Sequence, residues 1–387
     1  MMDNKPVILI FAANNIAKDG ITGAAIGTEI VINSMQDTHK IETITLRTNG
    51  LSQLSKEGIR AKFCSLLSAT FISFEALFNL VKRGLKKPKV DIFYMLPAAS
   101  TFGILRNLIT VLLVRIFYRK VRIVYHIRNG NYFEEKANIL NHITQYVNKC
   151  ADRIIVLSRL LLPDNKIKNS LDDDCIFILP NTIDSEIISK STNSTDKLQK
   201  PWPIKVLYLS NFIEDKGYLT LLEAGKILVE NGLAEEFIFT FHGKWLSSQD
   251  RITFESQAEF LTDNGLDVHV GGSISSRADV QSLYAQNHVF CLPTSYAAEA
   301  QPRSILEAMS NECVVVSTRF RSIPDMVIHE ETGLLIDYRS PKLLADALSS
   351  LTPEEIKRMS QAGLKHFEQE FSPSAVKLQL LEALKFT

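Results

Sequence analysis

The sequence predicts an α/β protein built from two doubly wound units. Short apolar runs rich in Val, Ile, Phe and Tyr alternate with helix-like stretches along the 387 residues. Near-continuous apolar strands in this arrangement are typical of parallel sheets that are covered on both faces. A polar, proline-containing seam separates six of these runs from the next five. The length alone favours two to three domains of roughly 150 residues each.

The predicted strands follow from these apolar runs. In the first half they cover residues 7–13, 41–47, 91–96, 121–127, 153–158 and 175–180. In the second half they cover residues 204–210, 237–243, 267–271, 288–293 and 314–317. Helix starts are clearest at Ser340 and Thr352, because each precedes a proline at the first helical position. Thr352 and Glu355 also have the spacing of a capping box.

The seam at residues 191–203 is polar and without periodicity, which is typical of an interdomain linker. We therefore expect an N-terminal domain over residues 1–190 and a C-terminal domain over residues 204–370. Residues 371–387 are expected to form a C-terminal helix, and its return to the N-terminal domain is one option.

The composition excludes several classes of protein. Hydrophobic residues at 45% and charged residues at 22% are ordinary for a soluble globular protein. A net charge of zero argues against a nucleic-acid partner. The five cysteines are scattered without a C-x-x-C pair, and the eight histidines form no ligand cluster, so neither a disulfide framework nor a metal site is expected. The N-terminus shows no signal peptide, so the expected location is the cytoplasm.

The charge is distributed unevenly along the chain. Residues 1–190 hold 25 Lys and Arg against 17 Asp and Glu, and residues 56–128 alone hold 14 against 3. These basic residues flank two apolar segments, 63–81 and 104–117. Three interpretations remain open: core-facing helices with solvated basic faces, contact with an anionic membrane surface on the inner face of the plasma membrane, or a transmembrane helix.

Two glutamates follow the predicted strand 288–293. Glu299 lies in the loop, and Glu307 lies in a helix that is expected to begin near Ser304. A helix start offers backbone N–H groups and a positive dipole end, so a diphosphate could bind there. The two carboxylates could then accept hydrogen bonds from sugar hydroxyls. The alternative is structural, because Ser304 and Glu307 also have capping-box spacing.

The second half carries a series of motifs in a recognisable order. They are Tyr208-Leu209-Ser210-Asn211-Phe212, Asp215-Lys216-Gly217, Phe241-His242-Gly243, Glu299 with Glu307, Ile323-Pro324-Asp325 and Glu331-Thr332-Gly333-Leu334-Leu335. In this order they resemble the family 4 retaining glycosyltransferases over about residues 204–350. The first half matches more loosely, at residues 151–158 and 178–184, at His126 and at the glycine-rich residues 20–27. The resemblance implies the GT-B fold, in which two Rossmann-like domains face a central cleft.

The resemblance also implies an activity, which is retaining transfer of a hexosyl group from a nucleotide diphosphate sugar. The acceptor would be a glycan or a lipid-linked molecule of cell-surface polysaccharide biosynthesis, with neither a cofactor nor a metal ion. Lys216 would bind the phosphates, Glu299 the sugar hydroxyls and Glu307 the ribose, while His126 would face the transferred sugar. Further residues implied at the donor site are Gly23, Asn211, Ala300, Gln301, Arg303 and the backbone amides of Ser304, Ile305 and Leu306.

The chain departs from the family pattern at three places. Asn211 stands where the family usually has a second phosphate-binding Arg, and Arg303 is a candidate replacement. Ala300-Gln301 replaces Gly-Phe, and Arg321-Ser322 replaces Gly-Gly. The missing Arg keeps an alternative open, a catalytically inactive nucleotide-sugar-binding subunit of a glycosyltransferase complex. Asp172-Asp173-Asp174 contains a D-x-D pattern, which we interpret as a solvated turn.

Overall fold

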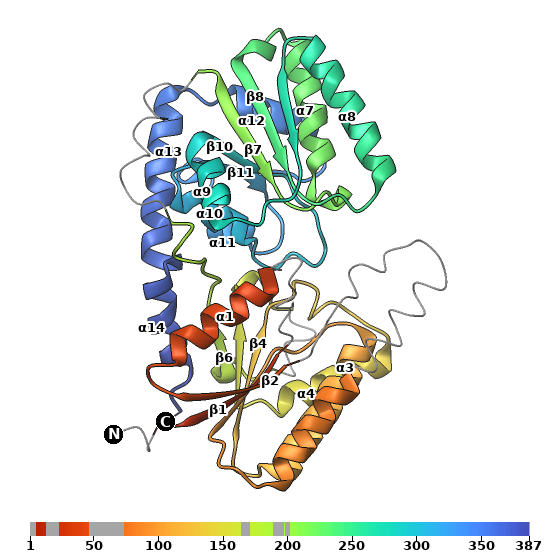
Figure 1. Ribbon diagram of the computed structural model, residues 1–387, viewed down its shortest axis with the longest axis vertical. Coiled ribbons are helices and arrows are strands. Elements are labelled where there is room, and N and C mark those ends of the chain that lie inside the picture. The colour runs from red at the N-terminus through yellow and green to blue at the C-terminus, as the bar shows by residue number, and fades with distance from the viewer. Residues whose placement is uncertain are drawn as a thin grey trace. The chain divides into compact units, whose positions relative to one another are not determined.

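A computed structural model describes residues 5–12, 23–45, 73–163, 171–188, 197 and 202–386. The chain divides into two compact units, each with its own sheet (Figure 1). The first unit comprises Met1–Pro180 together with Lys377–Thr387, and the second comprises Asn181–Val376. Within the described residues, no helix is both long and apolar enough to cross a bilayer.

The first unit is a six-stranded parallel sheet in the order β2-β1-β3-β4-β5-β6. Its strands are β1 (Val7–Ala12), β2 (Lys40–Thr45), β3 (Ile92–Met95), β4 (Arg122–Ile127), β5 (Arg153–Val156) and β6 (Ile176–Ile178). The helical elements are α1 (Gly23–Met35), residues 73–85, α3 (Thr101–Phe117), α4 (Asn138–Lys149), η2 (Arg159–Leu161) and η3 (Asp173–Cys175). Each predicted strand of this half is confirmed.

The second unit is also a six-stranded parallel sheet, in the order β12-β11-β10-β7-β8-β9. Its strands are β7 (Ile204–Leu209), β8 (Phe237–His242), β9 (Asp267–Gly271), β10 (Val289–Leu292), β11 (Val314–Thr318) and β12 (Gly333–Ile336). The sequence predicted five strands here, and β12 is the one it missed. Its four residues include Gly and two Leu, which carry a weak strand signal by themselves.

Helices cover the second sheet. They are η4 (Glu214–Lys216), α7 (Tyr218–Glu230), η5 (Ala234–Glu236), α8 (Ser248–Asp263), α9 (Arg277–Gln286), α10 (Arg303–Ser310), α11 (Ile323–Met326), α12 (Pro341–Ser349), α13 (Pro353–His366), the π-helical turn η6 (Phe367–Phe371) and α14 (Pro373–Ala383). The last of the helices in the chain, α14, continues into residues that belong to the first unit. The Thr352 hydroxyl accepts from the Glu355 amide at 3.2 Å, as the capping-box spacing predicts.

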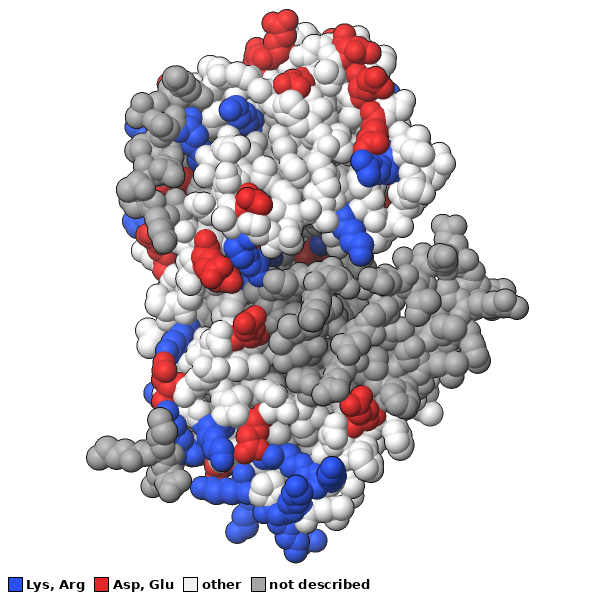
Figure 2. Space-filling model, viewed as in Figure 1, with Lys and Arg blue, Asp and Glu red and all other residues white. Residues whose placement is uncertain are grey.

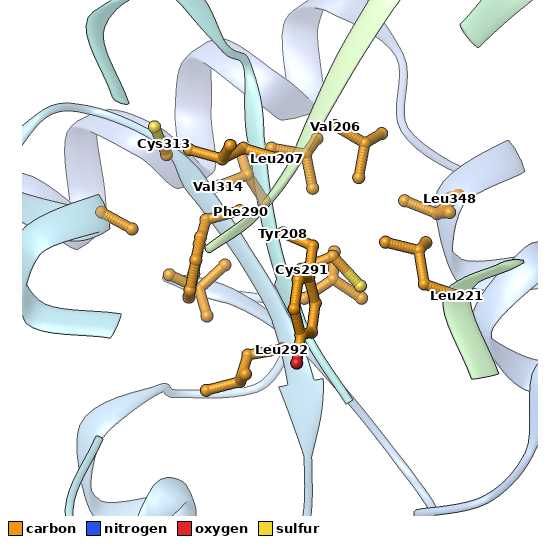
Figure 3. Packing of buried hydrophobic residues seen from close by; sticks show 14 of the residues in the cluster. Val206, Leu207, Tyr208, Leu221, Phe290, Cys291, Leu292, Cys313, Val314 and Leu348 are labelled. Atoms are coloured by element: carbon orange, nitrogen blue, oxygen red, sulfur yellow. The ribbon is translucent and has the colours of Figure 1, made fainter. Parts of the chain in front are cut away.

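The core of the second unit explains the apolar character of its strands. Every residue of β10 and β11 is buried. Leu221 of α7 and Leu348 of α12 lie beside Val206 of β7, and Phe290 belongs to the same buried cluster (Figure 3). A strand packed on both faces has no solvent side, so its sequence reads as a continuous apolar run and not as an alternation.

The boundary between the units precedes the predicted linker. The Asn181 amide donates to the Gln301 side-chain oxygen, and the Thr182 hydroxyl donates to the Phe371 carbonyl at 2.6 Å. Ile183 and Ile187 are buried in the core of the second unit. The segment after β6 therefore belongs to the second unit, because these contacts hold it there. Of the seam at residues 191–203, the structure describes 197, 202 and 203.

The end of the chain packs against the first unit from Lys377 onward. The Lys377 ammonium lies 2.8 Å from an Asp37 carboxylate oxygen. The Phe386 ring lies beneath two guanidinium groups, those of Arg122 at 5.2 Å and Arg153 at 5.3 Å. Cation–π contacts of this kind hold Phe386, near the C-terminus, against arginines of β4 and β5.

Candidate functional site

The loop after β7 is fixed against the end of β10. Gly217 follows η4 with φ at +83°, a backbone conformation that glycine adopts without strain. A Cβ atom at Gly217 would lie 2.2 Å from the Pro293 carbonyl oxygen, so the two backbones approach too closely for any side chain. The Asp215 carbonyl also accepts from the Ser295 amide at 2.7 Å. Lys216 is thereby positioned by backbone contacts on both sides.

This loop brings together two residues that the sequence predicted as partners in one site. The Lys216 ammonium lies 3.1 Å from a Glu299 carboxylate oxygen, and the two side chains are 19% and 12% exposed. The same ammonium lies 5.4 Å from the centre of the Tyr296 ring. A cation and an acceptor carboxylate therefore meet at the carboxyl edge of the second sheet, which is where ligands bind in open α/β sheets.

The helix that carries Glu307 begins one residue earlier than predicted. Arg303 is the first residue of α10, and Pro302 occupies the N-cap position without a side-chain cap bond. Ser304 consequently lies inside the helix and does not cap it. The capping-box interpretation of Glu307 is wrong, because the box requires the serine at the N-cap.

Glu307 instead has a partner from another helix. The Tyr284 hydroxyl of α9 donates to a Glu307 carboxylate oxygen at 3.1 Å and lies 3.3 Å from the Ser304 carbonyl oxygen. Burial raises the pKa of Glu307, while the nearby charge of Arg303 and the Tyr284 hydrogen bond oppose that rise. The carboxylate is therefore oriented and partly desolvated, which suits an acceptor for sugar or ribose hydroxyls.

The start of α10 is only partly available to a ligand. The Ile305 amide donates to the Pro302 carbonyl at 3.2 Å, so this predicted phosphate contact already has an internal partner. The side chains of Ile305 and Leu306 are fully buried in the core of the second unit. The predicted role of the Ser304 and Leu306 amides rests on their position near the positive end of the helix.

Gln301 serves the fold of the second unit. Its side-chain oxygen accepts from the Asn181 amide, and its carbonyl accepts from the Asn181 side chain at 2.9 Å. These groups are 120 residues apart in sequence, which explains why no local pattern predicted the contact. Neighbouring Ala300 is 6% exposed, and its carbonyl accepts from the Ser322 hydroxyl.

The Arg321-Ser322 pair contacts the same glutamate loop. Arg321 has φ at +52°, in the left-handed region, and its guanidinium donates to the Ala297 carbonyl at 3.1 Å. Ser322 holds the Ala300 carbonyl. Both residues replace glycines of the family pattern, and together they fasten the loop that presents Glu299. The replacement is visible in the sequence, but these contacts with the loop depend on the tertiary structure.

Asn211 lies just past β7 and is exposed. Its backbone carbonyl accepts from the Tyr208 hydroxyl at 3.2 Å and from the Ile213 amide at 2.8 Å. An asparagine side chain at this position carries no charge for a phosphate. Arg303, the candidate replacement, exerts its charge on Glu307.

His126 belongs to the first unit, where it lies near the end of β4 and is 2% exposed. Its Nδ1 atom lies 2.5 Å from the Tyr94 hydroxyl, and its Nε2 atom is buried without a hydrogen-bond partner among the described residues. Burial, followed by the charge of Arg128, holds the pKa of His126 well below its usual value. The imidazole is therefore neutral at physiological pH.

The remaining predicted features of the first unit are less informative. Gly23 is the first residue of α1, and the rest of its glycine-rich loop up to residue 22 lies outside the described residues. Asp172 caps η3 by accepting from the Asp174 amide at 3.2 Å, and the three aspartates are exposed. Across the described ranges, no group of three or more His, Cys, Asp or Glu is placed to hold a metal ion.

Comparisons with known proteins show that this chain is similar to glycosyltransferases. Residues 190–365 match the family model of the glycosyl transferases group 1. The capsular polysaccharide biosynthesis glycosyltransferase CapM of Staphylococcus aureus is 24% identical over 321 residues, which cover 80% of this chain and 80% of CapM. The matched region of the family model includes Lys216, Glu299 and Glu307.

Solved structures are similar over nearly the whole chain. The crystal structure of HepE from Anabaena in complex with UDP matches with a TM-score of 0.69 and 17% identity, covering 97% of this chain and 99% of HepE. A glycosyltransferase from Rickettsia africae matches with a TM-score of 0.70 and 16% identity, covering 99% and 100%. Similarity at this level of identity shows the fold, and the predicted GT-B class is confirmed.

Proposed function

We propose that this chain is a retaining glycosyltransferase of cell-surface polysaccharide synthesis. It would move a hexosyl group from a nucleoside diphosphate sugar to a glycan or lipid-linked acceptor. The match of residues 190–365 to a glycosyltransferase family and the similarity to CapM support this proposal. The observation that carries it is the contact of Lys216 with Glu299 at the carboxyl edge of the second sheet.

The reaction requires two bonds to change at the anomeric carbon. The bond to the diphosphate oxygen breaks, and its electron pair leaves with the phosphate. The acceptor hydroxyl forms the new bond on the same face of the sugar, and its proton passes to the departing diphosphate or to water. The chief electrostatic demand is the negative charge that grows on the leaving diphosphate, so fixed positive groups near it lower the barrier.

Lys216 meets this demand in the proposed mechanism. Glu299 and the backbone contacts of the Gly217 loop hold its ammonium in place before the donor binds. A diphosphate beside it would share this cation with Glu299, while the start of α10 adds its dipole. Glu299 then accepts hydrogen bonds from the hydroxyls of the transferred sugar. No metal ion is part of the proposal.

Glu307 would bind the ribose of the donor. Its carboxylate is oriented by Tyr284, so it can accept both ribose hydroxyls without first losing rotamer freedom. His126 is the residue of the first unit that the family resemblance assigns to the transferred sugar. A neutral imidazole suits a hydrogen bond to a sugar hydroxyl and would not act as a cation there.

The proposal is tested by release of nucleoside diphosphate from a panel of nucleotide sugars. Lys216→Ala and Glu299→Ala should each lower the release rate by roughly 100-fold, the effect of removing one preorganised electrostatic group. Arg251→Ala and Glu255→Ala are the matched controls, because that exposed ion pair lies on α8 of the same unit, at 2.8 Å. Unchanged release in the two site variants would contradict the proposal.

A second candidate function is a nucleotide-sugar-binding subunit without activity of its own. The uncharged, exposed Asn211 favours it, because one of the two expected phosphate cations is missing there. The same assay separates the candidates. Tight donor binding without release, even when membrane extracts supply acceptors, would favour the inactive subunit.

A further inference from the structure

Helix α3 in the first unit is apolar on two faces. Its inward face is buried in the core, with Ile104, Val111 and Val114 each at most 1% exposed. Its outward face carries a second row at helical spacing: Phe102 (49% exposed), Leu105 (40%), Ile109 (45%), Leu112 (43%) and Ile116 (65%). A helix that is hydrophobic all round is normally buried, so we expect another apolar surface to cover the outward row.

The neighbouring helix extends this apolar surface. Residues 73–85 are helical and expose Phe74 at 68%, Phe78 at 58% and Leu85 at 69%. Gly84 lies directly against the Phe117 ring, since a Cβ atom there would be 2.4 Å from Cγ of that ring. The two helices therefore lie side by side at their C-terminal ends. Together they hold eight of the nineteen exposed large apolar side chains among the described residues.

The same C-terminal ends carry a cluster of basic side chains. Its members are all exposed, and none makes an ion pair within the described ranges: Lys82, Lys86, Lys87, Arg119 and Lys120. Figure 2 shows Lys and Arg gathered at the end of the first unit where Figure 1 draws the ends of α3 and its neighbour. We call these basic residues and the eight apolar side chains the apolar–basic face.

We propose that the apolar–basic face docks on the surface of an anionic lipid bilayer. Its apolar side chains would enter the boundary between headgroups and acyl chains, and its lysines and arginines would contact anionic headgroups. Such docking lies in the plane of the interface and needs no spanning helix. It would place the first unit at a membrane whatever reaction the second unit catalyses, so it stands independently of the proposed function.

Charge argues against a second copy of the chain as the occupant of this face. Residues 73–122 hold ten Lys and Arg but only two Asp and Glu. One of those acidic residues, Asp91, already lies 3.6 Å from the Lys89 ammonium. Two such faces brought together would bury unpaired like charges at a low-dielectric contact, which is unfavourable. An anionic lipid surface supplies the opposite charge.

The test is co-sedimentation of the full chain with vesicles of phosphatidylcholine, with and without phosphatidylglycerol. We expect binding to be at least about tenfold stronger to the anionic vesicles and to weaken between about 0.1 M and about 0.5 M NaCl, because salt screens the headgroup attraction. If vesicle affinity changes neither with phosphatidylglycerol nor with salt, the proposed contact between the basic residues and anionic headgroups is wrong.

Three variants separate the contributions. The triple variant Leu105→Ser, Ile109→Ser and Ile116→Ser should lose at least about tenfold in vesicle affinity, and so should Lys86→Gln, Lys87→Gln and Lys120→Gln. The matched control exchanges equally exposed apolar residues of the second unit, Ile252→Ser, Phe260→Ser and Leu343→Ser, and should bind as the wild type does. All three should remain folded at the assay temperature, because every exchanged side chain is exposed, and the melting temperature of each variant checks this.

Two results would overturn the proposal. One is equal vesicle binding by the apolar triple variant and the wild type. The other is a wild-type dimer in analytical ultracentrifugation that becomes monomeric in the apolar triple variant while neither protein binds vesicles. The second result would assign the face to a second copy of the chain.

Discussion

The contact between Gly217 and Pro293 offers the sharpest test of the site. Gly217→Ala adds one methyl group at a position whose φ is +83° and whose Cβ would lie 2.2 Å from the Pro293 carbonyl oxygen. Gly232→Ala is the matched control, because its φ of +74° imposes the same kind of backbone strain while its Cβ would meet no atom within 4 Å. The clash with Pro293 is therefore present in Gly217→Ala and absent from Gly232→Ala.

The magnitude follows from these distances. The left-handed conformation costs a non-glycine residue about 1–2 kcal/mol, and both variants bear that cost. In Gly217→Ala the contact must also lengthen by about 1 Å to reach ordinary packing distance. Because Lys216 is the adjacent residue, its ammonium would move away from Glu299. A displacement of about 1 Å at a positioning group can lower a rate by about 100-fold, equivalent to about 2.7 kcal/mol.

The assay is nucleoside diphosphate release, measured beside the melting temperature of each variant. We expect Gly232→Ala to lower the melting temperature by a few degrees and to leave release unchanged. Gly217→Ala should lose about 100-fold in release at temperatures where the second unit remains folded. A wild-type release rate in Gly217→Ala would show that the Pro293 contact does not position Lys216. If the release rate falls equally in both variants, backbone strain and not the clash causes the loss.

Three further predictions concern other contacts. Lys197→Met should destabilise the second unit by about 3 kcal/mol in denaturant unfolding, because the buried ammonium donates to three backbone carbonyls, the shortest of these bonds being 2.7 Å. Tyr284→Phe removes the hydrogen bond that lowers the pKa of Glu307, so that pKa rises and the acidic limb of donor affinity, measured by calorimetric titration, moves to higher pH. Asn211→Arg should tighten nucleoside diphosphate binding about fivefold by adding a second cation near Lys216.

Each of these predictions has a result that would contradict it. If the unfolding midpoint of Lys197→Met equals that of the wild type, water molecules replace the ammonium as donors to the three carbonyls. An unshifted acidic limb in Tyr284→Phe would show that Glu307 protonation does not limit binding. Unchanged affinity in Asn211→Arg would indicate that the position after β7 lies too far from the diphosphate.

Much of the fold could be predicted because parallel strands leave a strong local signal. Strands such as β10 and β11 are buried on both faces, so their residues must be apolar without interruption. The short strand β12 escaped prediction because its place in the sheet comes from pairing with β11. Burial in a sheet is a tertiary property, and four residues carry too little pattern to reveal it.

The candidate site divides in the same way. The order of Lys216, Glu299 and Glu307 along the chain was enough to suggest a donor site. The hydrogen-bond partners of the predicted site residues could not be seen in the sequence. Tyr284 approaches Glu307 from a different helix, and Asn181 is 120 residues away from its partner Gln301. Hydrogen bonds between distant segments depend on which side chains the completed fold brings within about 3 Å.

The amino-acid sequence alone specifies two parallel α/β units and the chemical groups of the site, a lysine–glycine loop and two glutamates in a fixed order. How these groups are used depends on the packing of the folded chain. The tertiary structure pinned the Lys216 loop on Pro293, assigned Gln301 to the fold and showed that Ser304 does not cap α10. It also left the apolar side chains on one face of α3 exposed. Residue type sets what a side chain can do, but burial and neighbours, which only packing supplies, select which of those roles it performs.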